Sequence, residues 1–294
     1  MKSKAILITI VMLLPIIVYA SGLDNTKVDW WIVREKDHKT PRVNDKLSYK
    51  LEDYDAYYVG DTEKPVLYLT FDEGYENGQT GAILDSLKEN DVPAIFFVTS
   101  PYLADNADLI TRMVDEGHLV VNHSHHHPSM PKYAINARDF ALEFKDVEDK
   151  YEKITGKSMV KLFRPPMGHY SQKSLAMTKD LGYQTIFWSF AYADFDVNKQ
   201  PDPTNARKLI SENFHNGAII LLHAVSKTNA QILGDVIKDA KAQGYTFELW
   251  PYPGAKESKE LKDLDDNTES DDNTESEDTA DSADDSTESA EPAL

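Results

Sequence analysis

Ionisable side chains directly follow five of the apolar runs in this chain. They are Asp72 with Glu73, then His123, Arg164, Asp194 and His223. Two neighbouring carboxylates at a strand end can hold a metal, share a proton, or divide into a base and a ligand. Each group alone has a structural explanation, such as a solvated turn in which Asp72 caps the next helix. Their joint occurrence at the ends of five strands favours a single site.

The histidine run that starts at His123 has the composition of a metal site. It reads HSHHHP and supplies four imidazoles. His123 and His127 face the same way if the backbone is helical there, which suits two ligands of one metal. Glu73 as a third ligand gives a site with open positions for water and substrate, as catalytic zinc requires. The spacing leaves a pairing of His123 with His126 open, and the alternative without a metal is an exposed histidine run.

The elements that must position these groups alternate between apolar strands and amphipathic helices. We expect strands at residues 66–69, 94–99, 119–121, 160–163, 185–188, 218–222 and 245–249. We expect helices at 80–90, 107–116, 136–155, 171–181, 204–214 and 228–243. This order predicts an α/β fold, a distorted (β/α) barrel of about seven parallel strands, with an open doubly wound sheet as the alternative. In such a barrel the functional site lies at the carboxyl ends of the strands.

Composition excludes several classes of site and partner. The 294 residues include no cysteine, so a disulfide, a thiolate metal site and a cysteine nucleophile are all excluded. The net charge is −19, but fourteen acidic residues lie between Asp263 and the C-terminus with no basic residue among them, which leaves −5 for the rest of the chain. No basic stripe of the kind that follows a phosphate backbone is present in the sequence, so nucleic acid is not an expected partner.

The two ends of the chain differ from the middle. Residues 1–20 have two lysines, an apolar stretch and small residues near Ala20, which predicts a signal peptide cleaved after Ala20 and an exported, extracytoplasmic protein. The alternative is an uncleaved membrane anchor. Residues 253–294 repeat DDNTES and predict a disordered acidic tail. Residues 21–60 predict an aromatic-rich wrap that packs on the main domain (61–252), with a glycan-stacking platform as the alternative use of its rings.

Four strings in a fixed order resemble those of a known family. TFDEG, HSHHH, RPPMG and LLH resemble the motifs of the polysaccharide deacetylases, the NodB-like carbohydrate esterases that remove acetyl groups from acetylated glycans. The resemblance covers roughly residues 60 to 250. TFDEGYENG followed by FFVT, with QTIFWS before Asp194, is most similar to the muramic de-N-acetylases that prepare peptidoglycan for δ-lactam formation in spore cortex.

The resemblance implies a NodB-like distorted βα barrel and one divalent metal ion, most often Zn²⁺. It also implies a role for each matching residue. These roles are catalytic base for Asp72, metal ligands for His123 and His127, tether of the base for Arg164, orienting carboxylate for Asp194 and general acid for His223.

Three residues depart from the family pattern. Glu73 stands where the family has an aspartate ligand, Met167 where many members have tyrosine, and Phe195 where tryptophan is common. The backbone N–H of Met167 can still serve an oxyanion. These departures motivate an alternative hypothesis, a non-catalytic wall-binding protein that keeps the deacetylase fold.

The chemistry required for amide hydrolysis uses these groups in complementary roles. A metal can polarise the poorly electrophilic amide carbonyl and acidify a bound water. Asp72 then takes the proton of that water, and Arg164 orients Asp72 through a bidentate pair. The oxyanion is stabilised by the metal and by a backbone N–H near Met167. His223, held as imidazolium by Asp194, protonates the departing amine.

The sequence therefore predicts a metal-dependent hydrolase, monomeric, that removes the N-acetyl group from peptidoglycan sugars and releases acetate. N-acetylmuramic acid is the expected sugar. Alternatives are a chitooligosaccharide or xylan deacetylase, the non-catalytic wall-binding protein, and a surface metal scavenger that uses the histidine run and the acidic tail.

Overall fold

A computed structural model describes residues 22–252. The predicted signal peptide (1–20) and the predicted acidic tail (253–294) lie outside the described residues. No helix within residues 22–252 is both long enough and apolar enough to cross a membrane.

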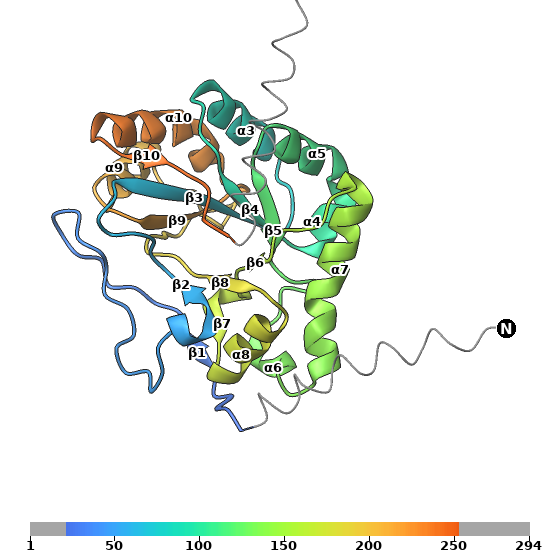
Figure 1. The fold of residues 1–294 in the computed structure, drawn as a ribbon. Coiled ribbons are helices and arrows are strands. Elements are labelled where there is room, and N and C mark those ends of the chain that lie inside the picture. Colours follow the sequence, from blue (N-terminus) through green and yellow to red (C-terminus); the bar gives the residue numbers. More distant parts are fainter. Residues whose placement is uncertain (1–21, 253–294) are drawn as a thin grey trace, which may run out of the picture. The chain divides into compact units, whose positions relative to one another are not determined.

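Within this part of the chain, eight strands form one parallel sheet in the order β10-β3-β4-β5-β6-β8-β2, with β9 paired to the other side of β3 (Figure 1). The strands are β2 (Ala56–Tyr57), β3 (Val66–Glu73), β4 (Ile95–Val98), β5 (Leu119–Asn122), β6 (Leu162–Phe163), β8 (Gln184–Ile186), β9 (Ala218–His223) and β10 (Thr246–Phe247). The predicted distorted barrel is confirmed. Strand β2 was not predicted, because two residues in a charged segment carry no periodic signal.

Helices follow most of the strands and cover the outside of the sheet (Figure 1). They are α3 (Thr80–Glu89), α4 (Ser100–Asp105), α5 (Ala107–Asp115), α6 (Met130–Tyr133), α7 (Ala137–Thr155), α8 (Gln172–Asp180), α9 (Pro203–Ser211) and α10 (Lys227–Ala242). Local sequence sets the ends of α7. The Asn136 side chain accepts hydrogen bonds from the first N–H groups, and Gly156 ends the helix at φ 69°. The short helices α4 and α6 were not predicted.

Strand β3 separates two apolar layers. Its residues alternate between the faces of the sheet, as extended backbone requires. Leu67, Leu69 and Phe71 pack in the layer that includes the helices. Val66 and Tyr68 pack in the barrel interior. Continued to the end of the strand, this alternation puts Asp72 on the interior face and Glu73 on the helix face.

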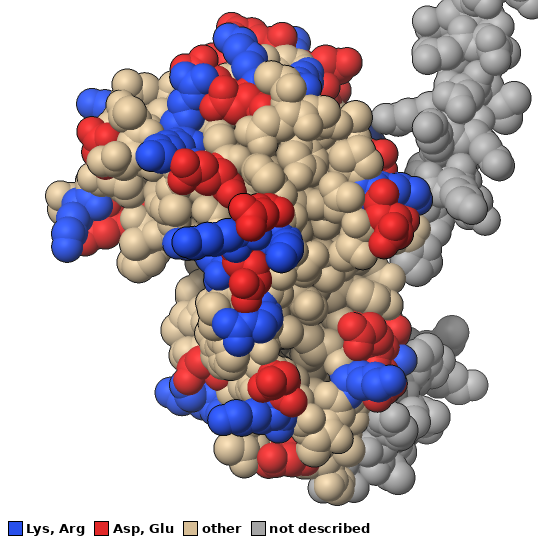
Figure 2. Space-filling model, turned by 90° about the vertical axis from the view of Figure 1, so that its left-hand side faces the viewer, with Lys and Arg blue, Asp and Glu red and all other residues tan. Residues whose placement is uncertain are grey.

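The N-terminal segment, residues 22–60, lies against one side of the barrel (Figure 1). Its strand β1 (Val28–Asp29) pairs antiparallel with β7 (His169–Tyr170). The Trp30 ring stacks on Phe187 with a centroid distance of 4.3 Å. Aromatic packing thus holds this segment on the main domain. On the face shown in Figure 2, basic and acidic side chains are interspersed and form no patch of one sign.

Candidate active site

Asp72 and Arg164 form a buried ion pair at the carboxyl end of the sheet. Asp72 Oδ1 accepts a hydrogen bond of 2.7 Å from Arg164 Nη1. The other guanidinium nitrogens donate to the carbonyls of Ile186 (3.0 Å) and Phe187 (3.3 Å). Arg164 therefore makes a single hydrogen bond to Asp72. The prediction of a bidentate pair is wrong. Arg164 is fully buried, and its guanidinium carbon lies 4.0 Å from the Phe97 ring centroid.

The charge around Asp72 favours its ionised form. Burial alone would raise the pKa of its carboxyl, but the positive Arg164, followed by His123 and His223, outweighs burial and lowers the pKa below the ordinary value. Asp72 is therefore a carboxylate at neutral pH and can accept a proton.

His123 and His127 lie side by side next to Asp72. Their ring centroids are 4.9 Å apart. His123 Nδ1 lies 2.8 Å from the carbonyl oxygen of Arg164. Because a carbonyl only accepts, Nδ1 carries the proton, and the lone pair is left on Nε2. This Nε2 lies 3.6 Å from Asp72 Oδ2.

A turn, and not a helix, brings the two rings together. Ser124 and His127 both have left-handed backbones, with φ of 73° and 56°. The Ser124 hydroxyl accepts the N–H of His127 at 3.0 Å, and Asn122 Oδ1 accepts the N–H of Ser124 at 2.8 Å. The helical geometry assumed for the spacing of four is therefore absent, but the two imidazoles still meet.

Both imidazoles are held neutral. Burial lowers the pKa of His123 to about 4, although Asp72 opposes the shift. Burial likewise lowers the pKa of His127. Neutral imidazole is the form that binds a metal ion. The two neutral imidazoles therefore have the chemistry of two ligands of a divalent cation.

The other histidines of the run lie against acidic residues of α7. His126 Nδ1 lies 2.7 Å from Glu143 Oε1, and the His126 N–H donates to Glu143 Oε2 at 2.9 Å. His125 Nδ1 lies 2.7 Å from Asp146 Oδ2. Of the two pairings that the spacing left open, the structure brings together His123 and His127. The buried Glu143 was missed, since one glutamate on an amphipathic helix gives no signal.

Glu73 lies apart from the imidazole pair. It is fully buried, and neither carboxyl oxygen has a hydrogen-bond partner. Burial, and after it the negative Glu76 and Asp72, raises the pKa of Glu73 well above the ordinary value, which favours the protonated form. Within residues 22–252, no three histidine, aspartate or glutamate residues are grouped closely enough to hold a metal ion. The predicted ligand set of Glu73 with His123 and His127 is not assembled, because neighbours on β3 face opposite sides.

His223 and Asp194 form a second anchored pair. His223 Nδ1 lies 2.7 Å from Asp194 Oδ1, and the His223 N–H donates to Asp194 Oδ2 at 2.9 Å. Asn229 Nδ2 donates to the same Oδ2 at 2.6 Å. Burial would lower the pKa of His223, but Asp194 outweighs burial and raises it. Asn229 was missed because the sequence shows it only as a residue in the first turn of α10.

His223 stands directly opposite Asp72. The two residues are register partners on the paired strands β9 and β3. Asp72 has a lowered pKa and His223 a raised one, so an ionised carboxylate faces an imidazole that holds its proton more tightly. Neighbouring groups tuned in opposite directions can act as base and acid of one reaction.

Met167 lies in a strained turn three residues after Arg164. Its backbone is left-handed (φ 59°), which is uncommon for a residue with a side chain, and the side chain is 50% exposed. The next residue, Gly168, also has positive φ, and a Cβ there would lie 2.7 Å from the Cβ of Trp30. Strain of this kind concentrates at functional sites. Phe195, 59% exposed, lies near the site, with its ring centroid 5.8 Å from that of His223.

Comparison with known proteins gives consistent matches. Residues 59–186 match the polysaccharide deacetylase family. The chain is 44% identical over 230 residues to the peptidoglycan-N-acetylmuramic acid deacetylase PdaA of Bacillus subtilis, covering 78% of this chain and 86% of that protein. It is 30% identical over 199 residues to a peptidoglycan-N-acetylglucosamine deacetylase of Bacillus cereus, covering 66% and 90%.

A solved structure also matches. The structure of Bacillus subtilis PdaA, described as a family 4 carbohydrate esterase, superposes with a TM-score of 0.74 at 41% identity. The match covers 84% of this chain and all of that one.

Proposed function

Because the chain belongs to the polysaccharide deacetylase family, we propose that it hydrolyses the N-acetyl group of N-acetylmuramic acid in peptidoglycan and releases acetate. The observation that carries the proposal is the Asp72 carboxylate facing the His223 imidazole across two paired strands. Such a pair supplies the base and the acid that amide hydrolysis needs. The similarity to PdaA supports the muramic sugar.

The metal in this proposal is held by His123 and His127. Both are neutral and lie beside Asp72. In His123 the Arg164 carbonyl contacts Nδ1, so the lone pair of Nε2 is available to a metal ion. These residues would hold a divalent cation, with Zn²⁺ as the proposed ion, and its chemistry would be to polarise the amide carbonyl and acidify water. We leave Glu73 out of this ligand set, because the alternation along β3 directs its side chain to the face opposite that of Asp72.

The proposed reaction uses the residues of the chain in sequence. Asp72, fixed by Arg164, takes a proton from water, and the water oxygen forms a bond to the acetyl carbon. The backbone N–H of Met167 stabilises the oxyanion that develops. His223 then donates its proton to the sugar nitrogen as the C–N bond breaks. Acetate and a free amine leave, and Asp194 holds the imidazole in position throughout.

The substrate implies where the protein works. Peptidoglycan lies outside the cytoplasmic membrane, so we propose an extracytoplasmic protein, in agreement with the apolar N-terminal sequence. An alternative substrate is N-acetylglucosamine of the same polymer, which the similarity to the Bacillus cereus enzyme supports at lower identity.

Mass spectrometry of peptidoglycan glycan strands treated with the purified protein tests the proposal. We expect loss of one acetyl group from muramic acid, with an equal amount of acetate in solution. The matched control is Asp72→Asn, which keeps the size of the side chain and removes the base. Glycan strands that keep every acetyl group, with metal supplied, would instead support the non-catalytic wall-binding protein.

A further inference from the structure

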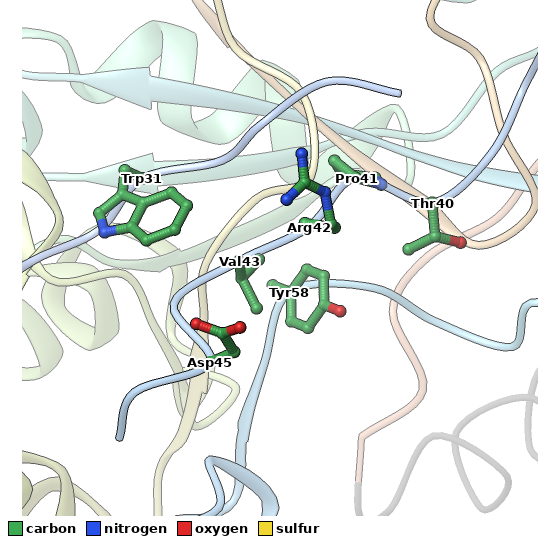
Figure 3. Close-up of a pocket in the computed structure, with 7 residues that line it drawn as sticks. All are labelled: Trp31, Thr40, Pro41, Arg42, Val43, Asp45 and Tyr58. Carbon is green, nitrogen blue, oxygen red and sulfur yellow. The ribbon is translucent and has the colours of Figure 1, made fainter. Parts of the chain in front are cut away.

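The N-terminal segment contains a groove of about 360 Å³, which we call the Trp31 groove (Figure 3). Residues that line it include Trp31, Thr40, Arg42, Val43, Asp45 and Tyr58. In the view of Figure 3, the side chains of Arg42, Val43 and Tyr58 lie between Trp31 on one side and Thr40 on the other. All of these residues come from the segment before the catalytic motifs, and none has a role in the proposed reaction.

Hydrogen bonds of its neighbour Trp30 tie Trp31 to the turn that contains Met167. The N–H of its neighbour Trp30 donates to the carbonyl of Gly168 at 2.9 Å, and Gly168 adjoins Met167. The Trp30 indole N–H donates to the carbonyl of Trp188 at 3.1 Å. Trp31 is one residue from these contacts, and consecutive Cα atoms are only about 3.8 Å apart.

A second anchor lies on the other side of Trp31. Arg34 Nη2 donates to the carbonyl of Ala191 at 2.5 Å, and the chain continues from Ala191 to Asp194. The segment from Trp30 to Arg34 therefore runs along two loops that carry site residues, the turn with Met167 and the loop with Asp194. Trp31, which lines the groove, is part of this segment.

The chemistry of the groove fits a sugar. The Trp31 side chain is 43% exposed, whereas Trp30 beside it is buried in a stack on Phe187. An exposed indole offers an apolar face of the size of a sugar ring. Arg42, whose Nε donates to Glu35 at 2.6 Å, and Asp45 put hydrogen-bond donors and acceptors around that face. A concave site with an aromatic wall and a few polar groups binds a ligand that has C–H faces and hydroxyl edges.

We propose that the Trp31 groove binds further sugar units of the same glycan strand whose N-acetyl group lies at Asp72 and His223. This inference rests on the proposed function, because the strand enters the groove from the reaction centre. The groove then acts as a length-sensing subsite: long strands gain contacts that a disaccharide is too short to make.

Calorimetric binding of peptide-free peptidoglycan glycans tests the proposal. The measurements use the Asp72→Asn protein, which does not turn the glycans over, and compare a disaccharide with an octasaccharide. We expect the octasaccharide to bind more tightly, and Trp31→Ala to remove about tenfold of its affinity, the size of one lost aromatic contact. Trp31→Ala should leave the affinity for the disaccharide unchanged. Trp31→Phe should keep part of the gain in affinity from disaccharide to octasaccharide.

The matched control is Leu142→Ala, which removes another half-exposed apolar side chain, on α7. It should leave both affinities unchanged, and melting temperatures of all variants should agree. The proposal is overturned if Trp31→Ala weakens the binding of both glycans equally, or the binding of neither. Equal binding of the two glycans before mutation, or no binding at all, overturns it as well. Failure of the proposed function is seen separately, as absent acetate release by the unmutated protein while the gain in affinity with length persists.

Discussion

Replacement of Arg164 by methionine tests whether Asp72 depends on one buried positive charge. Arg164→Met keeps an unbranched side chain against the Phe97 ring and removes the guanidinium. Asp72 then remains buried without its ion partner, and the carbonyls of Ile186 and Phe187 lose their hydrogen-bond donor. Burial, no longer outweighed, raises the pKa of Asp72 above its ordinary value. We therefore expect a less stable protein whose base is protonated at higher pH.

The magnitude follows from the burial of the pair. Removal of one partner of a buried ion pair costs about 3–5 kcal/mol of the free energy of unfolding. For a domain of this size, each kcal/mol shifts the melting temperature by about 2–4 °C, so we expect a fall of about 6–20 °C at pH 7. The matched control is Arg207→Met. Arg207 pairs with Asp235 and Asp239 at the surface, where an ion pair contributes about 0–1 kcal/mol.

The pH dependence separates lost charge from lost packing. In the wild type the pKa of Asp72 is lowered, so its ionisation stabilises the fold above the ordinary aspartate pKa of about 3.9, and this contribution is lost as pH falls. In Arg164→Met the pKa is raised, so stability is lost as pH rises above about 3.9. The gap in melting temperature between the two proteins should therefore widen from pH 4 to pH 7. A gap that is the same at both pH values would refute the electrostatic reasoning and leave only a packing defect.

Three further predictions concern the neighbouring groups. Asp72→Asn should lower kcat by at least about 10²-fold at unchanged metal affinity, and a smaller loss in a turnover assay would argue against its role as base. Asp194→Asn should lower the pKa of His223, so the alkaline limb of the pH–rate profile should move to lower pH, whereas an unmoved limb would mean that another group is the acid. Glu73→Gln should leave metal affinity unchanged in calorimetry. The melting temperature of this variant should exceed that of the wild type by a margin that grows with pH, because the raised pKa of Glu73 costs stability only as pH rises. A loss of metal affinity would show that Glu73 is a ligand.

The strand-end positions were predictable because long apolar runs mark where a buried strand must surface. Asp72 and His223 follow such runs on β3 and β9, and the barrel rule then brings the ends of parallel strands to one edge. The same rule gave the position of Arg164 after the two-residue strand β6. Fold and site position thus depend on a signal that is both local and strong.

Side-chain direction was harder to predict than position. The face that Glu73 occupies follows from an alternation that starts at Val66 and continues to the last residue of β3, so the sequence contains the signal but not where the strand ends. The turn that joins His123 to His127 needs two residues in a left-handed conformation. Ser124 and His127 have these conformations, but neither is a glycine, so the sequence does not predict the turn. The partners of Asp72 and Asp194 come from distant segments, and spacing along the chain cannot specify a hydrogen bond such as that from Asn229.

The opposite tuning of Asp72 and His223 has a common structural cause. Burial alone would raise the pKa of Asp72 and lower that of His223, and both shifts favour the wrong protonation state for the proposed roles. Each is reversed by one partner of opposite charge, Arg164 for the carboxylate and Asp194 for the imidazole, and both partners are themselves fully buried. The two partners lie on different loops, after β6 and after β8, so each group has a main partner of its own. The two groups also act on each other, since Asp72 raises the pKa of His223 and His223 lowers that of Asp72. The acid and the base can therefore stand opposite each other on adjacent strands and still hold the ionisation states that amide hydrolysis requires.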